Sequence, residues 1–387
     1  MQDTLTIGDV PFLDAPAPPR RLRALAAKGV GKTTSAIGWI FGLVSLVVGL
    51  SVLAALPILQ FLSLGYLLES SARVARSGRL RDGFIGVRRA GRIGGAALGV
   101  GFSLVPLWLV GAQARAASLL DPGGPTARGW RIAALVVWGL TCLHLLAAFA
   151  RDGRLRRFLW PFGNPVWLYR GLRRGGIYSS ARDGFWEFAA GLRLPYYFRL
   201  GLLGFLGTLV WLVPPSAMLG ASPRLPLVGL LGAFLLAIVV PGLPFLQVEY
   251  AIAGRAGALF SLRAVRGRFK RAPWAFAFAL TILLLASIPL YLLKIEMVPR
   301  DAAWLPSLVF IVFLAPARLL VGWAHARSGR RDRSRHWVFR LLGRLAIVAV
   351  ALLYVLVVFF SQYTSWEGAW SLHQQHAFLL PSPFWSE

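Results

Sequence analysis

The sequence predicts an all-α fold, a polytopic helical membrane bundle of about eight transmembrane helices. Hydrophobic residues make up 57% of the 387-residue chain and the mean hydropathy is +0.64, well above the values usual for soluble domains. Several apolar runs of about 20 residues carry almost no charge, and a helix needs about this length to cross a hydrocarbon core of about 30 Å. Arginines gather in the segments between these runs. Together these observations predict a membrane protein.

Eight apolar runs are each long enough for one span. They cover residues 36–68, 93–113, 132–150, 198–219, 227–252, 274–293, 304–324 and 341–361. Residues 1–35 form a polar and basic N-terminal lead, residues 36–361 the transmembrane domain, and residues 362–387 an exported C-terminal tail. The chain is therefore expected to have one membrane domain between two polar segments.

The loops between the spans alternate in charge. Residues 73–92, 151–199, 254–273 and 325–344 carry 7, 10, 6 and 7 Lys or Arg residues, whereas the other three loops carry 3, 1 and 2. Under the positive-inside rule the basic loops face the cytoplasm, which predicts a multi-pass protein of the bacterial cytoplasmic membrane. The positive-inside rule therefore explains the net charge of +27. We expect the partner of the chain to be the lipid bilayer and not nucleic acid.

The first apolar run is longer than one upright span requires, because its 33 residues extend about 50 Å as a helix. The favoured structure is a single long helix with a kink at Pro57. The alternative is a bend at Pro57 into a short hairpin, which returns the N-terminus to the cytoplasm. Eight spans would place the N-terminus outside, although the N-terminal lead is basic.

The pattern Leu-Pro-x-Leu-Gln occurs at residues 56–60 and again at 243–247, each time ahead of a basic loop. The two copies fall in the first and fifth spans and run in the same direction. Two four-helix halves in parallel repeat would account for this placement. Alternatively, the two copies arise by chance because the chain is rich in leucine and arginine.

Four polar residues lie inside apolar sequence and form a candidate solute path: Gln60, Gln247, Glu249 and Arg318. Prolines interrupt the helices beside both glutamines, as in transporters whose binding sites lie at broken helices. The alternative is a structural role, with each glutamine bonded to a neighbouring helix. Glu249 and Arg318 lie at similar distances from basic loops, so they could pair, or Arg318 could extend to the interface instead.

The cytoplasmic segment 151–199 combines arginines with aromatic residues, which is typical of short helices lying in the membrane interface. Packing beneath the bundle is the alternative. The candidate contacts with anionic lipid headgroups in this segment are Trp160, Trp167, Arg170, Arg173 and Arg174.

No motif in the sequence predicts catalysis, a cofactor or a metal. Cys142 is the one cysteine, and the 15 acidic residues follow no metalloprotease or hydrolase pattern. Residues 29–34 (GVGKTT) lack the first glycine of a phosphate-binding loop, because position 26 is alanine. His373 and His376 have no well-placed third metal ligand. We therefore expect no enzyme activity.

The residues around the two Leu-Pro-x-Leu-Gln copies also carry a family resemblance. They are Leu56, Pro57, Leu64, Gly65, Tyr66, Leu67, Gly78 and Gly83 in the first half, and Tyr250, Ala251, Gly254, Ala258, Phe260 and Leu262 in the second. In these motifs the chain resembles an uncharacterised family of prokaryotic polytopic membrane proteins. The resemblance implies an all-helical membrane bundle and no established activity.

Two functions fit these observations. The first is a permease- or carrier-like protein that handles small solutes along the polar path. The second is a non-enzymatic membrane scaffold or lipid-interacting protein that binds anionic headgroups through its basic cytoplasmic face.

Overall fold

The structure is a computed structural model that describes residues 20–160, 163–293, 295, 304–365 and 368–372. This part of the chain contains helices and no strand. In chain order the helices are α1 (Arg20–Ala55), α2 (Gln60–Ser77), η1 (Leu80–Gly83), α3 (Val87–Leu120), α4 (Pro125–Arg151), α5 (Leu155–Leu159), α6 (Gly163–Arg174), α7 (Ile177–Leu192), α8 (Leu194–Gly220), α9 (Pro226–Val239), α10 (Leu243–Ala253), η2 (Ala256–Phe260), α11 (Leu262–Arg271), α12 (Pro273–Leu292), α13 (Leu305–Gly329), α14 (Trp337–Thr364) and η4 (Gly368–Leu372).

The predicted all-α membrane bundle is confirmed. Among the described residues, seven helical segments are long and apolar enough to cross a membrane: Ser35–Ala55, α3, α4, Ala181–Gly220, α12, α13 and α14. α9 and α10 pass the same test together as a pair bent by 45°, which gives up to eight spans. Each of the eight predicted runs overlaps one of these segments.

Prolines and glycines mark the ends of several helices. α4, α9, α10, α12 and α13 each have a proline in the first turn, where a missing N–H breaks no helical hydrogen bond. α2 ends at Gly78 with φ 72° and α10 at Gly254 with φ 67°. This left-handed backbone closes a helix and suits glycine, which has no Cβ to clash.

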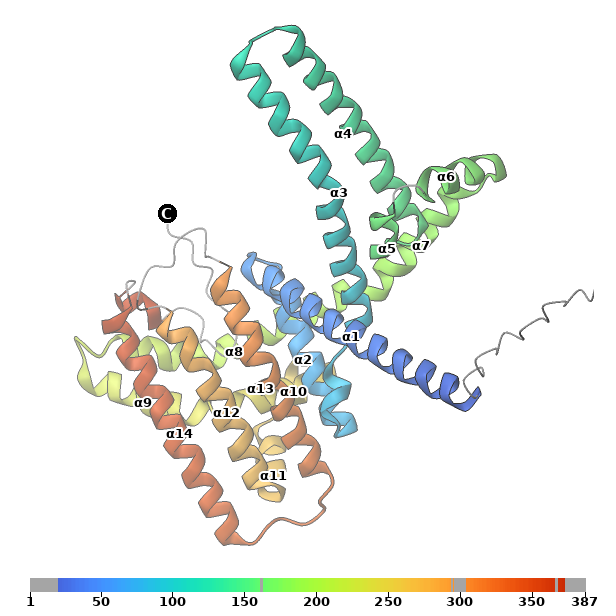
Figure 1. Cartoon of the computed structure of the whole chain (residues 1–387). Helices are drawn as coiled ribbons and strands as arrows, with labels where there is room; N and C mark the ends of the chain where they lie inside the picture. Colours follow the sequence, from blue (N-terminus) through green and yellow to red (C-terminus); the bar gives the residue numbers. More distant parts are fainter. Residues whose placement is uncertain (1–19, 161–162, 294, 296–303, 366–367, 373–387) are drawn as a thin grey trace, which may run out of the picture.

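Figure 1 shows a helical bundle and a long hairpin that projects from it. The hairpin consists of α3 and α4, whose apolar stretches are only 11% and 17% buried, as befits helices that face lipid. α2 and α10 lie deep in the bundle, with 12 of 18 residues of α2 and 9 of 11 residues of α10 buried. These two helices therefore bury several polar residues, among them Gln60, Glu69, Gln247 and Glu249.

The first apolar run is not the single kinked helix that the sequence favoured. Residues 56–59 separate α1 from α2, and Ile58 takes a left-handed φ of 68°. The hydroxyl of Ser63 donates to the carbonyl of Leu50 over 2.8 Å, whereas a continuous helix would hold residues this far apart in sequence about 20 Å apart. The chain turns back here because Pro57 lacks an N–H and disfavours helical backbone before it.

α2 then runs back along α1, as the hairpin alternative requires. The segment after α2 returns to the middle of α1, where the rings of Phe84 and Trp39 lie 5.8 Å apart. α3 follows α1 in the same direction, because Gly94, further along α3, packs against Ser45, further along α1. The N-terminal end of α1 therefore lies on the same side of the molecule as the start of α3.

The helix that follows each Leu-Pro-x-Leu-Gln pattern, together with the turn and the short 3-10 helix after it, forms a unit that occurs twice in the structure. After the glycine that ends α2 or α10, the next residue is extended: Arg79 has φ −117° and ψ 121°, and Arg255 has φ −120° and ψ 128°. A short 3-10 helix then follows in both copies, η1 or η2. The remaining helices of the two halves differ, since α3 and α4 project whereas α12 and α13 pack in the bundle (Figure 1). The turn and the short helix therefore recur after both copies, whereas the division of the chain into two parallel four-helix halves stays a prediction.

Candidate functional site

The segment 151–199 folds into short helices at the base of the α3–α4 hairpin (Figure 1). Gly175 and Gly176, with φ 74° and 78°, join α6 to α7 through a left-handed turn that glycine adopts without strain. Phe185 and Trp186 of α7 are each 63% exposed. These rings face outward, and the placement of the segment in the membrane interface stays a prediction.

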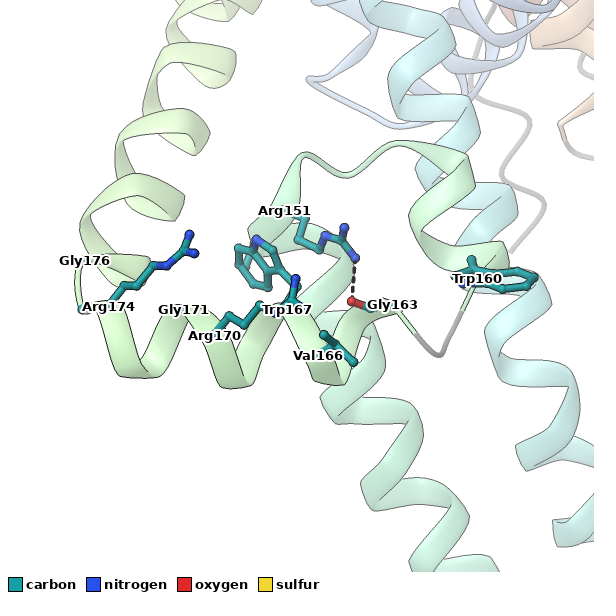
Figure 2. Close-up of a pocket in the computed structure, with 11 residues that line it drawn as sticks. Arg151, Trp160, Gly163, Val166, Trp167, Arg170, Gly171, Arg174 and Gly176 are labelled. Carbon is teal, nitrogen blue, oxygen red and sulfur yellow. Dashed lines mark hydrogen bonds between the residues drawn. The ribbon is translucent and has the colours of Figure 1, made fainter.

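A pocket of about 530 Å³ opens between the end of α4 and α6 (Figure 2). Four of the five predicted headgroup contacts line it, namely Trp160, Trp167, Arg170 and Arg174. Arg173 does not line it; its guanidinium lies 4.7 Å from the centre of the Tyr169 ring. The pocket volume falls in the range typical of ligand sites.

The pocket carries positive charge from three arginines, Arg151, Arg170 and Arg174. Among the described residues, no carboxylate lies within 4.0 Å of any of their guanidinium groups. The Arg151 guanidinium lies 5.7 Å from the centre of the Trp167 ring, within cation–π range. The arrangement offers several charged donors beside an aromatic wall, which suits an anion with an apolar part.

Arg151 is missing from the sequence prediction. In the sequence, Arg151 is marked only by its position directly after an apolar run. Arginines that set membrane topology occur at the same position, so this feature does not identify a binding residue. In the structure Nη1 of Arg151 donates to the carbonyl of Gly163 over 3.0 Å and to Oδ1 of Asn164 over 2.9 Å (Figure 2 shows the first of these). Because Gly163 and Asn164 begin α6, these bonds tie α6 to the end of α4 and close one wall of the pocket.

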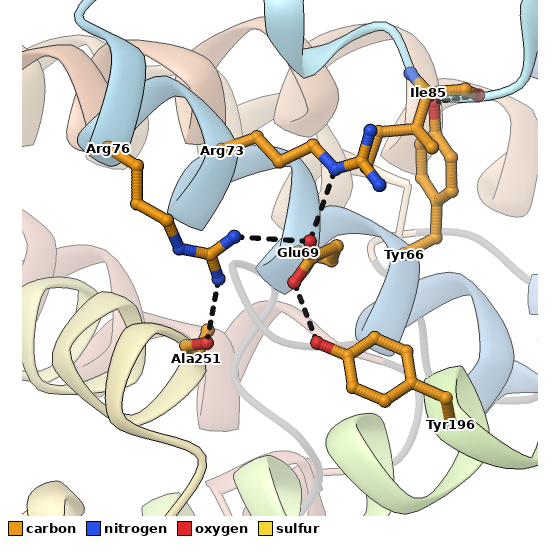
Figure 3. A network of polar contacts seen from close by, with 7 residues as sticks. All are labelled: Tyr66, Glu69, Arg73, Arg76, Ile85, Tyr196 and Ala251. Carbon is orange, nitrogen blue, oxygen red and sulfur yellow. Dashed lines mark hydrogen bonds and ion pairs between the residues drawn. The ribbon is translucent and has the colours of Figure 1, made fainter.

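A second group of polar residues lies where α2 meets α8 and α10 (Figure 3). The buried carboxylate of Glu69 accepts from Arg73 Nε at 3.2 Å, from Arg76 Nη1 at 3.5 Å and from the hydroxyl of Tyr196 at 2.7 Å. Arg76 Nη2 also donates to the carbonyl of Ala251, near the end of α10, over 3.3 Å. The network therefore joins the C-terminal part of α2 to the C-terminal end of α10.

Neither alternative for Arg318 holds: among the described residues it forms no ion pair with Glu249, and its side chain is buried and does not extend to the interface. The carboxylate of Glu249 accepts from Arg268 of α11 and lies 3.1 Å from Nε2 of His325. Arg318 instead donates through Nη1 to Oε1 of Gln247. The prediction failed because it compared positions along α10 and α13 alone, and did not foresee that α11 returns alongside Glu249.

The two glutamines do not face each other. Gln247, fully buried in α10, accepts from Arg318 and donates through Nε2 to the hydroxyl of Thr208 over 2.8 Å. Gln60 is buried at the first position of α2, and no hydrogen bond joins it to Gln247 in the described part of the chain. The structure therefore brings Gln247 and Arg318 together, and places Glu249 and Gln60 in separate surroundings.

Within the described residues, no group of three His, Cys, Asp or Glu side chains could hold a metal ion. His373 and His376, and most of the predicted C-terminal tail, lie outside the described residues, as do residues 1–19 of the N-terminal lead. Comparison with models of known families, with curated proteins and with solved structures finds no match. Any function must therefore be argued from the residues themselves.

Proposed function

We propose that this chain is a non-enzymatic integral membrane protein that binds an anionic lipid headgroup in the Arg151–Trp167 pocket. The observation that carries the proposal is the gathering of Arg151, Arg170 and Arg174 with two tryptophans in one pocket, with no described carboxylate within 4.0 Å of the arginines. Arginine suits a phosphate because its planar guanidinium presents several donors in a fixed geometry.

The position of the pocket suits a lipid better than a free solute. Arg151 is the last residue of the apolar helix α4, so we expect the pocket at the end of a membrane span, at the depth where headgroups meet acyl chains. Tryptophans are enriched at the same depth because one edge of the ring is polar and the body is apolar. The membrane is expected to be the bacterial cytoplasmic membrane, with the pocket on the cytoplasmic side.

The test compares two arginines of one helix. Full-length protein is reconstituted in phosphatidylcholine nanodiscs, and its preference for spin-labelled phosphatidylglycerol over phosphatidylcholine is measured by electron spin resonance. We expect Arg170→Gln, which removes a pocket arginine, to lower the preference about fivefold, the effect of roughly 1 kcal/mol for one basic residue near anionic lipid.

Arg173→Gln is the matched control, because it removes the same charge from the same helix outside the pocket. We expect Arg173→Gln to change the free energy of the lipid preference by less than half as much as Arg170→Gln does. Equal effects of the two variants would mean that α6 attracts lipid only through its overall charge, and the pocket proposal would be abandoned.

Carrier activity is the second candidate, and the repeated helix break favours it. α1–α2 and α9–α10 are interrupted at corresponding places, and the second break lies just before the buried Gln247. Broken helices in corresponding halves are a feature of many carriers. Swelling of proteoliposomes in isosmotic solutions of small solutes tests this. Solute entry that is lost in Gln247→Leu would support a carrier, and no entry above protein-free liposomes would exclude it for those solutes.

A further inference from the structure

Behind the pocket, hydrogen bonds lead from Arg151 through Asn164 to His144. Asn164 is completely buried; its Oδ1 accepts from Arg151 over 2.9 Å, and its Nδ2 lies 3.1 Å from Nδ1 of His144. The same Nδ2 donates to the carbonyl of Arg157 over 3.0 Å. Nε2 of His144 lies 3.0 Å from the carbonyl oxygen of Phe158. The chain of bonds thus connects α4, α5 and α6.

The Arg151 guanidinium at one end and the Phe158 carbonyl at the other determine which atoms between them donate and which accept. A guanidinium can only donate, so the oxygen of Asn164 must face Arg151 and its amide nitrogen must face His144. A carbonyl oxygen can only accept, so Nε2 of His144 carries the hydrogen that Phe158 receives. Nδ1 of His144 is then the acceptor for Asn164. Every bond in the chain is made only when His144 is neutral.

We infer that His144 and Asn164 are positioning residues for Arg151, and that the pocket holds its anion most tightly while His144 is neutral. The inference rests on the proposed function of the pocket. A second proton on His144 makes Nδ1 a donor that faces the donating amide of Asn164. Rotating the amide satisfies His144 but turns Nδ2 toward Arg151, which then loses its side-chain acceptor.

Charged residues near this chain of bonds also affect how strongly the pocket binds an anion when His144 gains a proton. They include Arg92 of α3, Arg151 of α4, Asp152 and Arg154 between α4 and α5, Arg156 and Arg157 of α5, Arg170, Arg173 and Arg174 of α6, and Arg182, Asp183 and Glu187 of α7. The carboxylate of Asp152 is already held by Arg154 at 3.4 Å and Arg157 at 3.7 Å. A charge on His144 would itself attract an anion, but His144 does not line the pocket and stands seven residues before Arg151 on α4, about 10 Å along the helix axis, and salt screens charges beyond about 8 Å. The lost hydrogen bond is not screened, so we expect a net loss of binding.

The experiment measures the preference of the full-length protein for spin-labelled phosphatidylglycerol in phosphatidylcholine nanodiscs at about pH 8 and about pH 5, the limits between which histidine changes charge. Phosphatidylglycerol is a phosphodiester and stays ionised at both values. We expect the preference of the unmodified protein to fall about fivefold at the lower pH, the size expected for the net contribution of a typical hydrogen bond. His144→Gln keeps one donor and one acceptor but does not titrate, so its preference should be the same at both pH values.

The outcomes separate this inference from the proposed function. If the unmodified protein prefers phosphatidylglycerol equally at both pH values, or if His144→Gln retains the pH dependence, the inference is overturned and the pocket remains a lipid site. If the unmodified protein shows no preference at either pH, the proposed function fails as well. Should His144→Gln not bind at all, Asn164→Ala decides, because it cuts the same connection and must also abolish the pH dependence. A dependence that survives in Asn164→Ala overturns the inference.

Discussion

Glu249 shows how the fold, and not the local sequence, selects the partner of a buried charge. Its side chain is 11% exposed, and an unpaired carboxylate at such a site would be costly. Arg268 is 19 residues away in sequence, on an amphipathic helix that packs on the bundle through Val265 and Phe269. His325 approaches from α13 on the other side. Glu249 therefore holds α10, α11 and α13 together.

Breaking this ion pair should destabilise the protein. We expect Glu249→Gln and Arg268→Gln each to lower the free energy of unfolding by about 2 to 3 kcal/mol, slightly below the usual range for buried pairs because Arg268 is 28% exposed. The double variant should lose clearly less than the sum, since the second substitution removes a charge that the first has left unpaired. Thermal unfolding in detergent measures the losses.

The control for this coupling is Glu187→Gln on α7, which removes a carboxylate that forms no ion pair with Arg268. Its effect and that of Arg268→Gln should be additive. Additive losses for Glu249→Gln and Arg268→Gln would show that these two residues are not partners.

The repeated unit depends on one backbone conformation at the end of α2 and of α10. After Gly78 and Gly254 the chain reverses, and the 3-10 helices η1 and η2 lie back against the bundle. Ile85, just beyond η1, accepts from and donates to the Tyr66 hydroxyl, each over 3.1 Å. In η2, the carbonyl of Leu259 accepts from Trp211 Nε1 of α8 over 3.1 Å. Both reversals satisfy main-chain groups that would otherwise be buried without partners.

Gly254 allows a clean test of this backbone requirement. Its φ is 67°, and a Cβ built on it would have no neighbouring atom within 4 Å, so any cost of Gly254→Ala comes from the backbone alone. We expect a loss of about 1 to 2 kcal/mol, the usual cost of a left-handed conformation for alanine. Gly254→Asn should lose less, because asparagine tolerates this region.

Gly257→Ala is the control for Gly254→Ala. Gly257 lies in η2 with equally open space and has no positive φ, so alanine should be nearly neutral there. Thermal unfolding of the three variants in detergent gives the comparison. A loss at position 257 as large as at 254 would show that the short helix, and not the left-handed glycine, is sensitive.

The sequence predicted the parts of this molecule that depend on composition over a whole helix. Hydropathy located the spans, because each must bury about 20 residues in hydrocarbon. It could not predict the reversals after Gly78 and Gly254, because a glycine before an arginine has no single conformation in sequence. The partner of Glu249 depended on one of these reversals. The pocket was predicted in part: α6 carries Trp167, Arg170 and Arg174, but Arg151 joins them only through the folding of α6 against α4.

The path of α2 also bears on the orientation of the whole chain. With α1 as one continuous span, eight spans would put the basic N-terminal lead outside, against the positive-inside rule. α2 runs back along α1, and its C-terminal end lies beside the basic end of α13, where Gly78 packs against Arg330. If α2 returns the chain across the membrane, the N-terminus and all four basic loops lie on one side.

Cysteine labelling tests this orientation directly. In a Cys142→Ser background, which removes the one native cysteine, single cysteines replace Ser35 at the start of the α1 span, Ser77 at the end of α2, or Thr126 in the first turn of α4. We expect Ser35→Cys and Ser77→Cys to react with a membrane-impermeant maleimide from the same side, the cytoplasmic one, because α1 and α3 run in one direction and α2 in the other. Thr126→Cys, at the start of α4 and just after the far end of α3, should react from the opposite side. If Ser35→Cys reacts together with Thr126→Cys, α2 does not return the chain, and the basic lead would have to be held outside against its charge.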